Sequence, residues 1–199
     1  MTPRPALWTA PNLVTLSRLI FVPLLLALAY VGAANAFLTL LCISLVTDIV
    51  DGKLARRLGQ ASEFGARLDS WADLATYGAV LVCAHWLRPD LIRDEAPYFW
   101  LLAASLVVPK VYGFLKFGKL TGYHTRGSVL SAYVVGIAIV TAFADLAAWP
   151  LRLAALFVVL PTLEDMAITT ILPRQVTMVP SLRRALELRR ELTAPPPPQ

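Results

Sequence analysis

Long apolar segments separated by short polar links make up most of the chain. A helix needs roughly 20 residues to cross the hydrocarbon core of a bilayer. Six segments are about this long, at residues 13–31, 35–55, 69–87, 98–117, 128–148 and 151–172. They show no period-two alternation, and open strand edges cannot face lipid. The pattern therefore predicts an all-α integral membrane protein with six transmembrane helices.

The end of the chain differs from these segments. Residues 181–191 mix apolar and charged positions, which indicates a short helix on the cytoplasmic surface, and residues 194–199 form a polyproline tail. We therefore expect a membrane domain over residues 1–180, followed by a cytoplasmic helix and tail over residues 181–199. The first segment also resembles a signal peptide, but further apolar segments follow it, so we expect it to be retained.

Composition supports a membrane protein. Of the 199 residues, 57% are hydrophobic and 16% are charged, whereas a soluble domain carries roughly 25% charged residues. The net charge of +5 comes from basic groups scattered between apolar segments, which favours contact with membrane lipids and not with nucleic acid. The two cysteines lie inside apolar segments and indicate no redox compartment.

The basic residues also predict an orientation. If both termini lie in the cytoplasm, Arg88, Arg93 and Arg152 lie outside, and the remaining 15 of the 18 lysines and arginines lie on or near the inner side. Cytoplasmic segments of membrane proteins carry such an excess of basic residues. We therefore expect both termini in the cytoplasm.

Four carboxylates lie near the inner ends of two neighbouring apolar segments. Asp48 and Asp51 are three residues apart on the second segment, and Asp69 and Asp73 are four apart on the third, so each pair shares a helical face. An antiparallel hairpin of these two helices would gather all four. Acidic side chains are costly inside a membrane, which makes a functional role the default hypothesis.

Two explanations of the four acids remain open at this point. Clustered carboxylates repel one another, and Mg²⁺ or Mn²⁺ would relieve the repulsion because both ions prefer oxygen ligands. Two such ions suit phosphoryl chemistry. Alternatively, the acids pair with nearby basic side chains in a structural network at the headgroup level, through Lys53, Arg56, Arg57 and Arg67.

The acids are part of a longer motif. It reads Asp48-x2-Asp51-Gly52-x2-Ala55-Arg56-x8-Gly65-x3-Asp69-x3-Asp73. This stretch resembles the full signature of the CDP-alcohol phosphatidyltransferase family at every specified position. The six spans and the entry to the first span, Pro11-Asn12-Leu13-Val14-Thr15-Leu16-Ser17-Arg18, are similar to the family as well.

The resemblance implies a reaction and a set of roles. Enzymes of this family move a substituted phosphate from a CDP-linked lipid, here CDP-diacylglycerol, to an alcohol acceptor and release CMP. It implies that Asp48, Asp51, Asp69 and Asp73 bind two divalent metal ions, and that Asp73 is also the general base. It also implies a nucleotide site and a homodimer in the membrane, with the active site at the cytoplasmic face. The nucleotide site would consist of Gly52, Ala55 and Arg56.

The acceptor is not decided by the motif. Asp69-Ser70-Trp71-Ala72-Asp73 is similar to phosphatidylserine synthases of the family, whereas the entry to the first span is similar to its glycerol-3-phosphate enzymes. Serine, glycerol-3-phosphate and an inositol compound are therefore candidate acceptors. A basic cluster at the inner end of the fourth segment would bind an acceptor phosphate or carboxylate, or else anionic lipid. It consists of Lys110, Lys116, His124 and Arg126.

One alternative comes from another functional class. In an ion-coupled transporter, intramembrane acids such as Asp48, Glu164 and Asp165 would be the carrier sites. The chain shows no inverted repeat, and the four signature acids lie at the cytoplasmic edge. Both features favour the enzyme.

Overall fold

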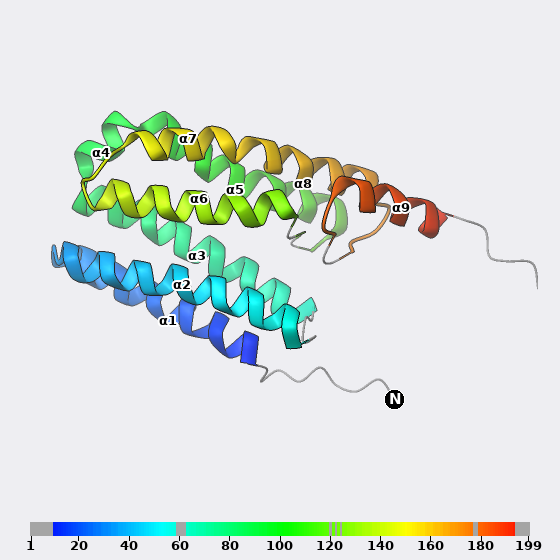
Figure 1. Cartoon of the computed structure of the whole chain (residues 1–199), viewed down its shortest axis with the longest axis horizontal. Coiled ribbons are helices and arrows are strands. Elements are labelled where there is room, and N and C mark those ends of the chain that lie inside the picture. The colour runs from blue at the N-terminus through cyan, green and yellow to red at the C-terminus, as the bar shows by residue number, and fades with distance from the viewer. Residues whose placement is uncertain are drawn as a thin grey trace, which may run out of the picture.

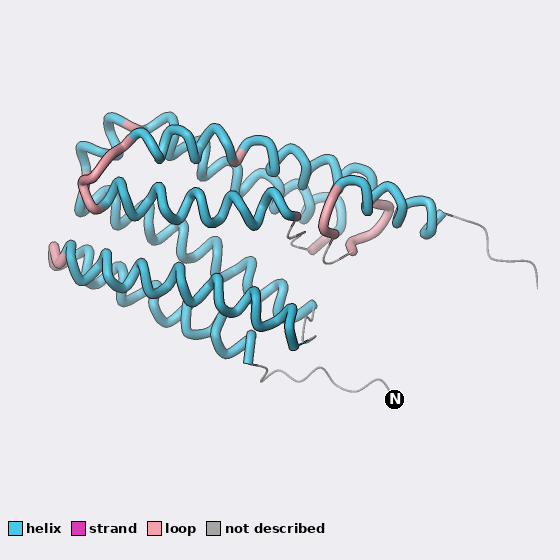
Figure 2. Tube along the Cα trace, viewed as in Figure 1, coloured by secondary structure: helices cyan, strands magenta, loops and turns pink. Residues whose placement is uncertain are grey.

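A computed structural model describes residues 10–58, 63–119, 121, 123, 125–176 and 179–193. Within this part of the chain the protein is all-helical and contains no strand (Figure 2). The helices, in chain order, are α1 (Ala10–Tyr30), α2 (Ala34–Leu58), α3 (Glu63–Leu87), α4 (Pro89–Asp94), α5 (Ala96–Phe117), α6 (Arg126–Phe143), α7 (Trp149–Phe157), α8 (Val159–Ile171) and α9 (Leu182–Thr193).

Two of these helices, α5 and α6, are long and apolar enough to cross a membrane. Shorter apolar stretches occupy Thr15–Tyr30 of α1 and Ala34–Thr47 of α2. Large apolar side chains of α5 point away from the protein, and Trp100 and Leu115 are 74% and 77% exposed. Such a surface is costly in water and is expected of a helix that faces lipid.

The sixth expected span is not one continuous helix. It is divided at Val158 into α7 and α8. Pro161 explains the break, because proline has no N–H to donate to the carbonyl of Phe157 four residues before it. The helical hydrogen bonds resume when the N–H of Thr162 donates to the carbonyl of Val158.

The end of α6 and the following link also differ from the prediction. The helix stops at Phe143 and not at residue 148, and Asp145 adopts a left-handed backbone with a φ of 60°. Arg88 stabilises this stop, because its guanidinium donates to the carbonyls of Ala142 and Phe143 and pairs with the Asp145 carboxylate at 2.6 Å. The expected loop at residues 88–97 contains a short helix, α4, with Pro89 in its first turn.

Among the described residues, α2 and α3 share few direct contacts, and the gathering of their four acids stays a prediction. Helix α1, in contrast, packs along both α2 and α3. Two apolar side chains on one face of α1, Leu25 and Ala29, are fully or almost fully buried in the main core. The two helices that carry the signature acids therefore share α1 as a packing partner.

The ends expected at the cytoplasmic side gather at one end of the bundle (Figure 1). Six helix ends lie there: the start of α1, the end of α2, the start of α3, the end of α5, the start of α6 and the end of α8. At this end α9 packs against α8. A second, smaller core forms at this end around Tyr123, Ile168, Leu172, Val179 and Ala185. The expected helix at residues 181–191 is confirmed as α9.

Candidate functional site

A buried arginine joins the two signature acids of α3. Arg18, on α1, has a side chain only 3% exposed. Its Nη2 atom donates to Asp69, and its Nη1 atom donates to Asp73 over 3.1 Å. Because Asp69 and Asp73 lie four residues apart on one face of α3, a single planar guanidinium reaches both carboxylates.

The local sequence explains why this contact forms. Small or short side chains, Ser70, Ala72 and Thr15, are buried beside it, which lets α1 and α3 approach closely. The sequence-based assignment of site residues did not include Arg18. The signal was present, because an arginine inside an apolar segment calls for a functional explanation as much as an aspartate does.

The carboxylates of Asp69 and Asp73 are only partly buried. Their side chains are 23% and 28% exposed, so a ligand can reach them. Carboxylate oxygens are the donors that Mg²⁺ and Mn²⁺ prefer, and the residues fit such ions in this respect. Among the side chains that the structure describes, no group of three or more potential metal ligands gathers. The side chains of Asp48 and Asp51 lie outside that part of the structure, and so do those of Gly52, Ala55 and Arg56.

Lys110, on α5, extends the polar site toward the opposite half of the bundle. It lies close enough to interact electrostatically with Asp73 of α3 and with Asp165 of α8. Among the described residues, Lys110 forms a direct ion pair with neither of them. One cation is therefore within electrostatic range of both carboxylates.

Lys116, in contrast, is bound by the fold. Its ammonium donates to the carbonyls of Thr169, Thr170 and Leu172 at 2.8, 2.8 and 3.1 Å. These carbonyls lie at the end of α8, where helical acceptors lack intrahelical donors. Since an ammonium has three protons, none remains for an acceptor in this arrangement. The structure thus gives Lys116 a helix-capping position, and its contact with an acceptor stays a prediction.

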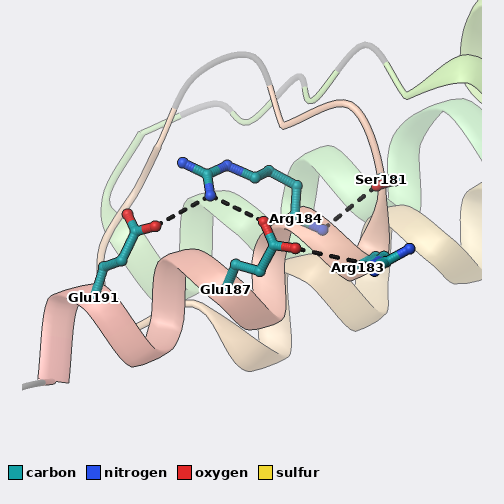
Figure 3. A network of polar contacts seen from close by, with 5 residues as sticks. All are labelled: Ser181, Arg183, Arg184, Glu187 and Glu191. Atoms are coloured by element: carbon teal, nitrogen blue, oxygen red, sulfur yellow. Dashed lines mark hydrogen bonds and ion pairs between the residues drawn. The ribbon is translucent and has the colours of Figure 1, made fainter.

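Glu164 has a structural partner too. Its Oε1 atom accepts from the backbone N–H of Leu182, 3.1 Å away, at the first residue of α9. Ser181 caps the same helix by accepting from the N–H of Arg184. Along α9, Arg184 bridges Glu187 and Glu191, and Arg183 lies near Glu187 (Figure 3). The Glu164 contact joins α9 to α8, and the other contacts stabilise α9 itself.

Two members of the predicted basic cluster remain, Arg126 and His124, and the structure describes only Arg126. The side chain of Arg126 is exposed at the first residue of α6. His124 lies outside the described residues. Its neighbours Tyr123 and Thr125 are buried. Burial raises the pKa of the Tyr123 hydroxyl, which lies 3.0 Å from the hydroxyl of Thr169.

Comparison with known families decides the broader assignment. The sequence model of the CDP-alcohol phosphatidyltransferase family matches residues 8–171. The chain belongs to this family. The match contains the whole signature from Asp48 to Asp73, and it also contains Arg18, Lys110 and Asp165.

Relatives within the CDP-alcohol phosphatidyltransferase family carry two names. The chain is 36% identical over 110 residues to a cardiolipin synthase (CMP-forming) of Oryza sativa subsp. japonica, which covers 53% of this chain and 32% of the relative. It is 42% identical over 81 residues to a CDP-diacylglycerol–glycerol-3-phosphate 3-phosphatidyltransferase of Salmonella choleraesuis, covering 38% of this chain and 44% of the relative. A Rickettsia typhi protein of the same name is 28% identical over 127 residues, covering 62% of this chain and 70% of the relative.

These matches cover only part of most relatives. The chain spans between about a third and less than half of the length of the first curated relatives that it matches. No solved structure matches the chain. The relatives are named as a cardiolipin synthase and as phosphatidyltransferases, and the transporter hypothesis gains no support from them. Within the phosphatidyltransferase family, the Arg18–Asp69–Asp73 contact connects the first helix to the second half of the signature.

Proposed function

We propose that the protein transfers a phosphatidyl group from CDP-diacylglycerol to an alcohol acceptor and releases CMP. The observation that supports this most directly is the pairing of Asp69 and Asp73 on one accessible face of α3, within a complete family signature. The relatives named as phosphatidyltransferases support the same activity.

In the proposed reaction, the acceptor hydroxyl attacks the phosphorus that bears the diacylglycerol. An oxygen–phosphorus bond forms, the bond to CMP breaks, and Asp73 takes the proton of the hydroxyl. A general base typically contributes about 10²–10⁴-fold to the rate. Arg18 would hold Asp73 in one orientation while leaving part of the carboxylate accessible. Positioning of the two reactants would supply much of the remaining acceleration.

Two divalent ions, Mg²⁺ or Mn²⁺, are part of the proposal. Asp48, Asp51, Asp69 and Asp73 would hold them, and when bound they would neutralise the charge of the diphosphate. The support is the oxygen-rich ligand set and the family signature. Gly52, Ala55 and Arg56 would form the nucleotide site. A glycine leaves room for a flat base against the backbone, and a guanidinium suits phosphate oxygens.

For the acceptor, glycerol-3-phosphate is the first candidate, because several relatives are named for it. Lys110, Arg126 and His124 are the proposed contacts to its phosphate. Serine and an inositol compound remain candidates, since the stretch from Asp69 to Asp73 is similar to phosphatidylserine synthases of the family. Lys116 is left out of the proposed acceptor site because three carbonyls already bind it.

We also propose six membrane spans with both termini and the active site at the cytoplasmic face. The gathering of the expected inner ends at one end of the bundle supports this topology (Figure 1). A homodimer is proposed from the family resemblance alone. Cysteine accessibility in oriented vesicles, with single cysteines at Thr193 and Asp90, would test the topology.

The direct test of the activity uses purified protein, CDP-diacylglycerol and a panel of alcohols, each with Mg²⁺, with Mn²⁺ or with EDTA. Mass spectrometry identifies the lipid product and chromatography measures CMP. We expect one acceptor to give a phosphatidyl lipid in a metal-dependent reaction. Full activity after exhaustive metal removal would contradict the two-metal proposal, and absence of CMP with every alcohol would contradict the proposed function.

A further inference from the structure

Asp165 terminates a short chain of hydroxyl groups at the inner end of the bundle. Thr125, at the N-cap of α6, lies 2.8 Å from the Ser128 hydroxyl and accepts from the Ser128 backbone N–H at 3.1 Å. The Ser128 hydroxyl lies 3.3 Å from both carboxylate oxygens of Asp165. All of these groups come from α6 and α8, and Thr125 is completely buried.

The protons of this chain have a single consistent arrangement. A carboxylate only accepts hydrogen bonds, so the Ser128 hydroxyl donates to Asp165. The Thr125 hydroxyl then donates to Ser128, because the one proton of Ser128 is already used. The Ser128 backbone N–H occupies an acceptor site of Thr125. Asp165 is thereby held in place by a donor that is itself oriented by a helix cap.

This single donor leaves Asp165 with unused acceptor capacity. A carboxylate has about four acceptor positions, and the Ser128 hydroxyl, shared between both oxygens at 3.3 Å, is its only side-chain donor among the described residues. Within the described part of the chain no cation pairs with it directly, although Lys110 lies within electrostatic range. A partly buried carboxylate with unused acceptor positions is stabilised by accepting another hydrogen bond.

The position of Lys110 relates this carboxylate to the reaction site. Lys110 interacts electrostatically with Asp165 and also with Asp73, the proposed base. The region therefore offers a cation within electrostatic range of the proposed base, and a carboxylate within electrostatic range of that cation that can accept a hydrogen bond. A small polar molecule that carries an anionic group and a donor beside its reacting hydroxyl matches this set.

We propose that Asp165 selects the acceptor by accepting a hydrogen bond from a hydroxyl or ammonium group adjacent to the attacking hydroxyl. Lys110 binds the anionic group of the same molecule, and Ser128 fixes the orientation of Asp165. The inference rests on the proposed phosphatidyl transfer and narrows the acceptor class. It makes Asp165 a specificity-determining residue, in contrast to Glu164, whose partner is the backbone of α9.

The test compares each acceptor with an analogue that lacks only the adjacent donor. The pairs are glycerol-3-phosphate with 3-hydroxypropyl phosphate, and L-serine with 3-hydroxypropanoate. We measure kcat/KM for both members of the pair that the protein uses. A charge-assisted hydrogen bond at this position predicts a preference of about 10–100-fold for the member with the donor.

In Asp165→Leu we expect this preference to fall to about threefold or less, because only the acceptor with the donor loses an interaction. The KM for CDP-diacylglycerol should not change. Asp165→Glu should restore part of the preference. Asp165→Asn keeps the shape of the aspartate side chain and replaces Asp165→Leu in the comparison if the leucine variant does not fold. Glu164→Gln is the matched control: it should lower thermal stability and keep the parent's preference.

The outcomes separate this inference from the function on which it rests. An unchanged preference in Asp165→Leu and Asp165→Asn, or an equal loss for both members of the pair, would assign Asp165 a structural role and overturn the inference. Use of only those acceptors that lack an adjacent donor would overturn it as well. No CMP release with any alcohol would instead refute the proposed function, and the inference would fall with it.

Discussion

Replacing Arg18 by methionine isolates the contact that organises the site. The guanidinium is almost completely buried and pairs with Asp69 and Asp73. Methionine keeps a similar length and suits an apolar helix, so the substitution removes the charge with little change in volume. The two carboxylates then face each other without the cation that lies between them.

The expected loss of folding stability in Arg18→Met depends on how exposed Asp69 and Asp73 are. Removing one member of a fully buried ion pair costs about 3–5 kcal/mol. The carboxylate side chains are 23% and 28% exposed, and water relieves part of this cost, so we expect a loss of about 2–3 kcal/mol. For a protein of this size each kcal/mol shifts the melting temperature by roughly 2–4 °C. The apparent melting temperature in detergent should therefore fall by roughly 4–12 °C.

Divalent cations supply the decisive comparison. If Asp69 and Asp73 bind Mg²⁺ or Mn²⁺, the ion replaces the missing positive charge, and saturating metal should stabilise Arg18→Met more than the parent protein. The matched control is Arg93→Met, because Arg93 and Asp90 form an ion pair whose side chains are 75% and 79% exposed. If Arg18→Met loses no more thermal stability than the control, the contact is not important for the fold. If saturating metal stabilises Arg18→Met and the parent protein equally, the result would refute metal binding at these acids.

Three further substitutions test other parts of the structure. Lys116→Met leaves three carbonyls of α8 without their donor and should destabilise the protein by about 1–3 kcal/mol, measured by thermal unfolding, whereas Lys119→Met, whose side chain is exposed, should not. Tyr123→Phe should reduce the loss of stability above about pH 10: burial raises the pKa of this tyrosine in the folded protein, so the unfolded chain ionises first and stability falls as pH rises. Gly52→Leu should fold normally but lose the thermal stabilisation that CDP gives the parent, and full retention of that shift would place the cytidine elsewhere.

The positions of the helices were the part of the fold that the sequence predicted best. Apolar runs of about 20 residues predicted them, and each expected span coincides largely with a helix of the structure or, for the sixth, with the pair α7 and α8. The boundaries were wrong where local backbone chemistry overrides hydropathy. Pro161 divides the last span although the apolar pattern continues through it. Arg88, in the link between α3 and α4, stabilises an early end of α6.

Tertiary contacts account for what the sequence did not predict about the site. The motif spacing predicted that Asp69 and Asp73 share a face, and the structure confirms it. The insertion of α1 against both α2 and α3 depends on packing that no local pattern encodes. The contact of Lys116 with the carbonyls at the end of α8 likewise depends on the packing of α5 against α8, which no local pattern encodes.

The measurement that tests the central claim most directly follows a labelled phosphate. CDP-diacylglycerol is prepared with the label in the phosphate attached to diacylglycerol, and the purified protein is supplied with glycerol-3-phosphate and Mg²⁺. We predict that the label moves entirely into a phosphatidyl lipid that contains the acceptor, with one unlabelled CMP released per product, and that Asp73→Asn lowers this rate by about 10²–10⁴-fold. Recovery of the label in CMP, or in phosphatidic acid regardless of the alcohol supplied, would contradict phosphatidyl transfer.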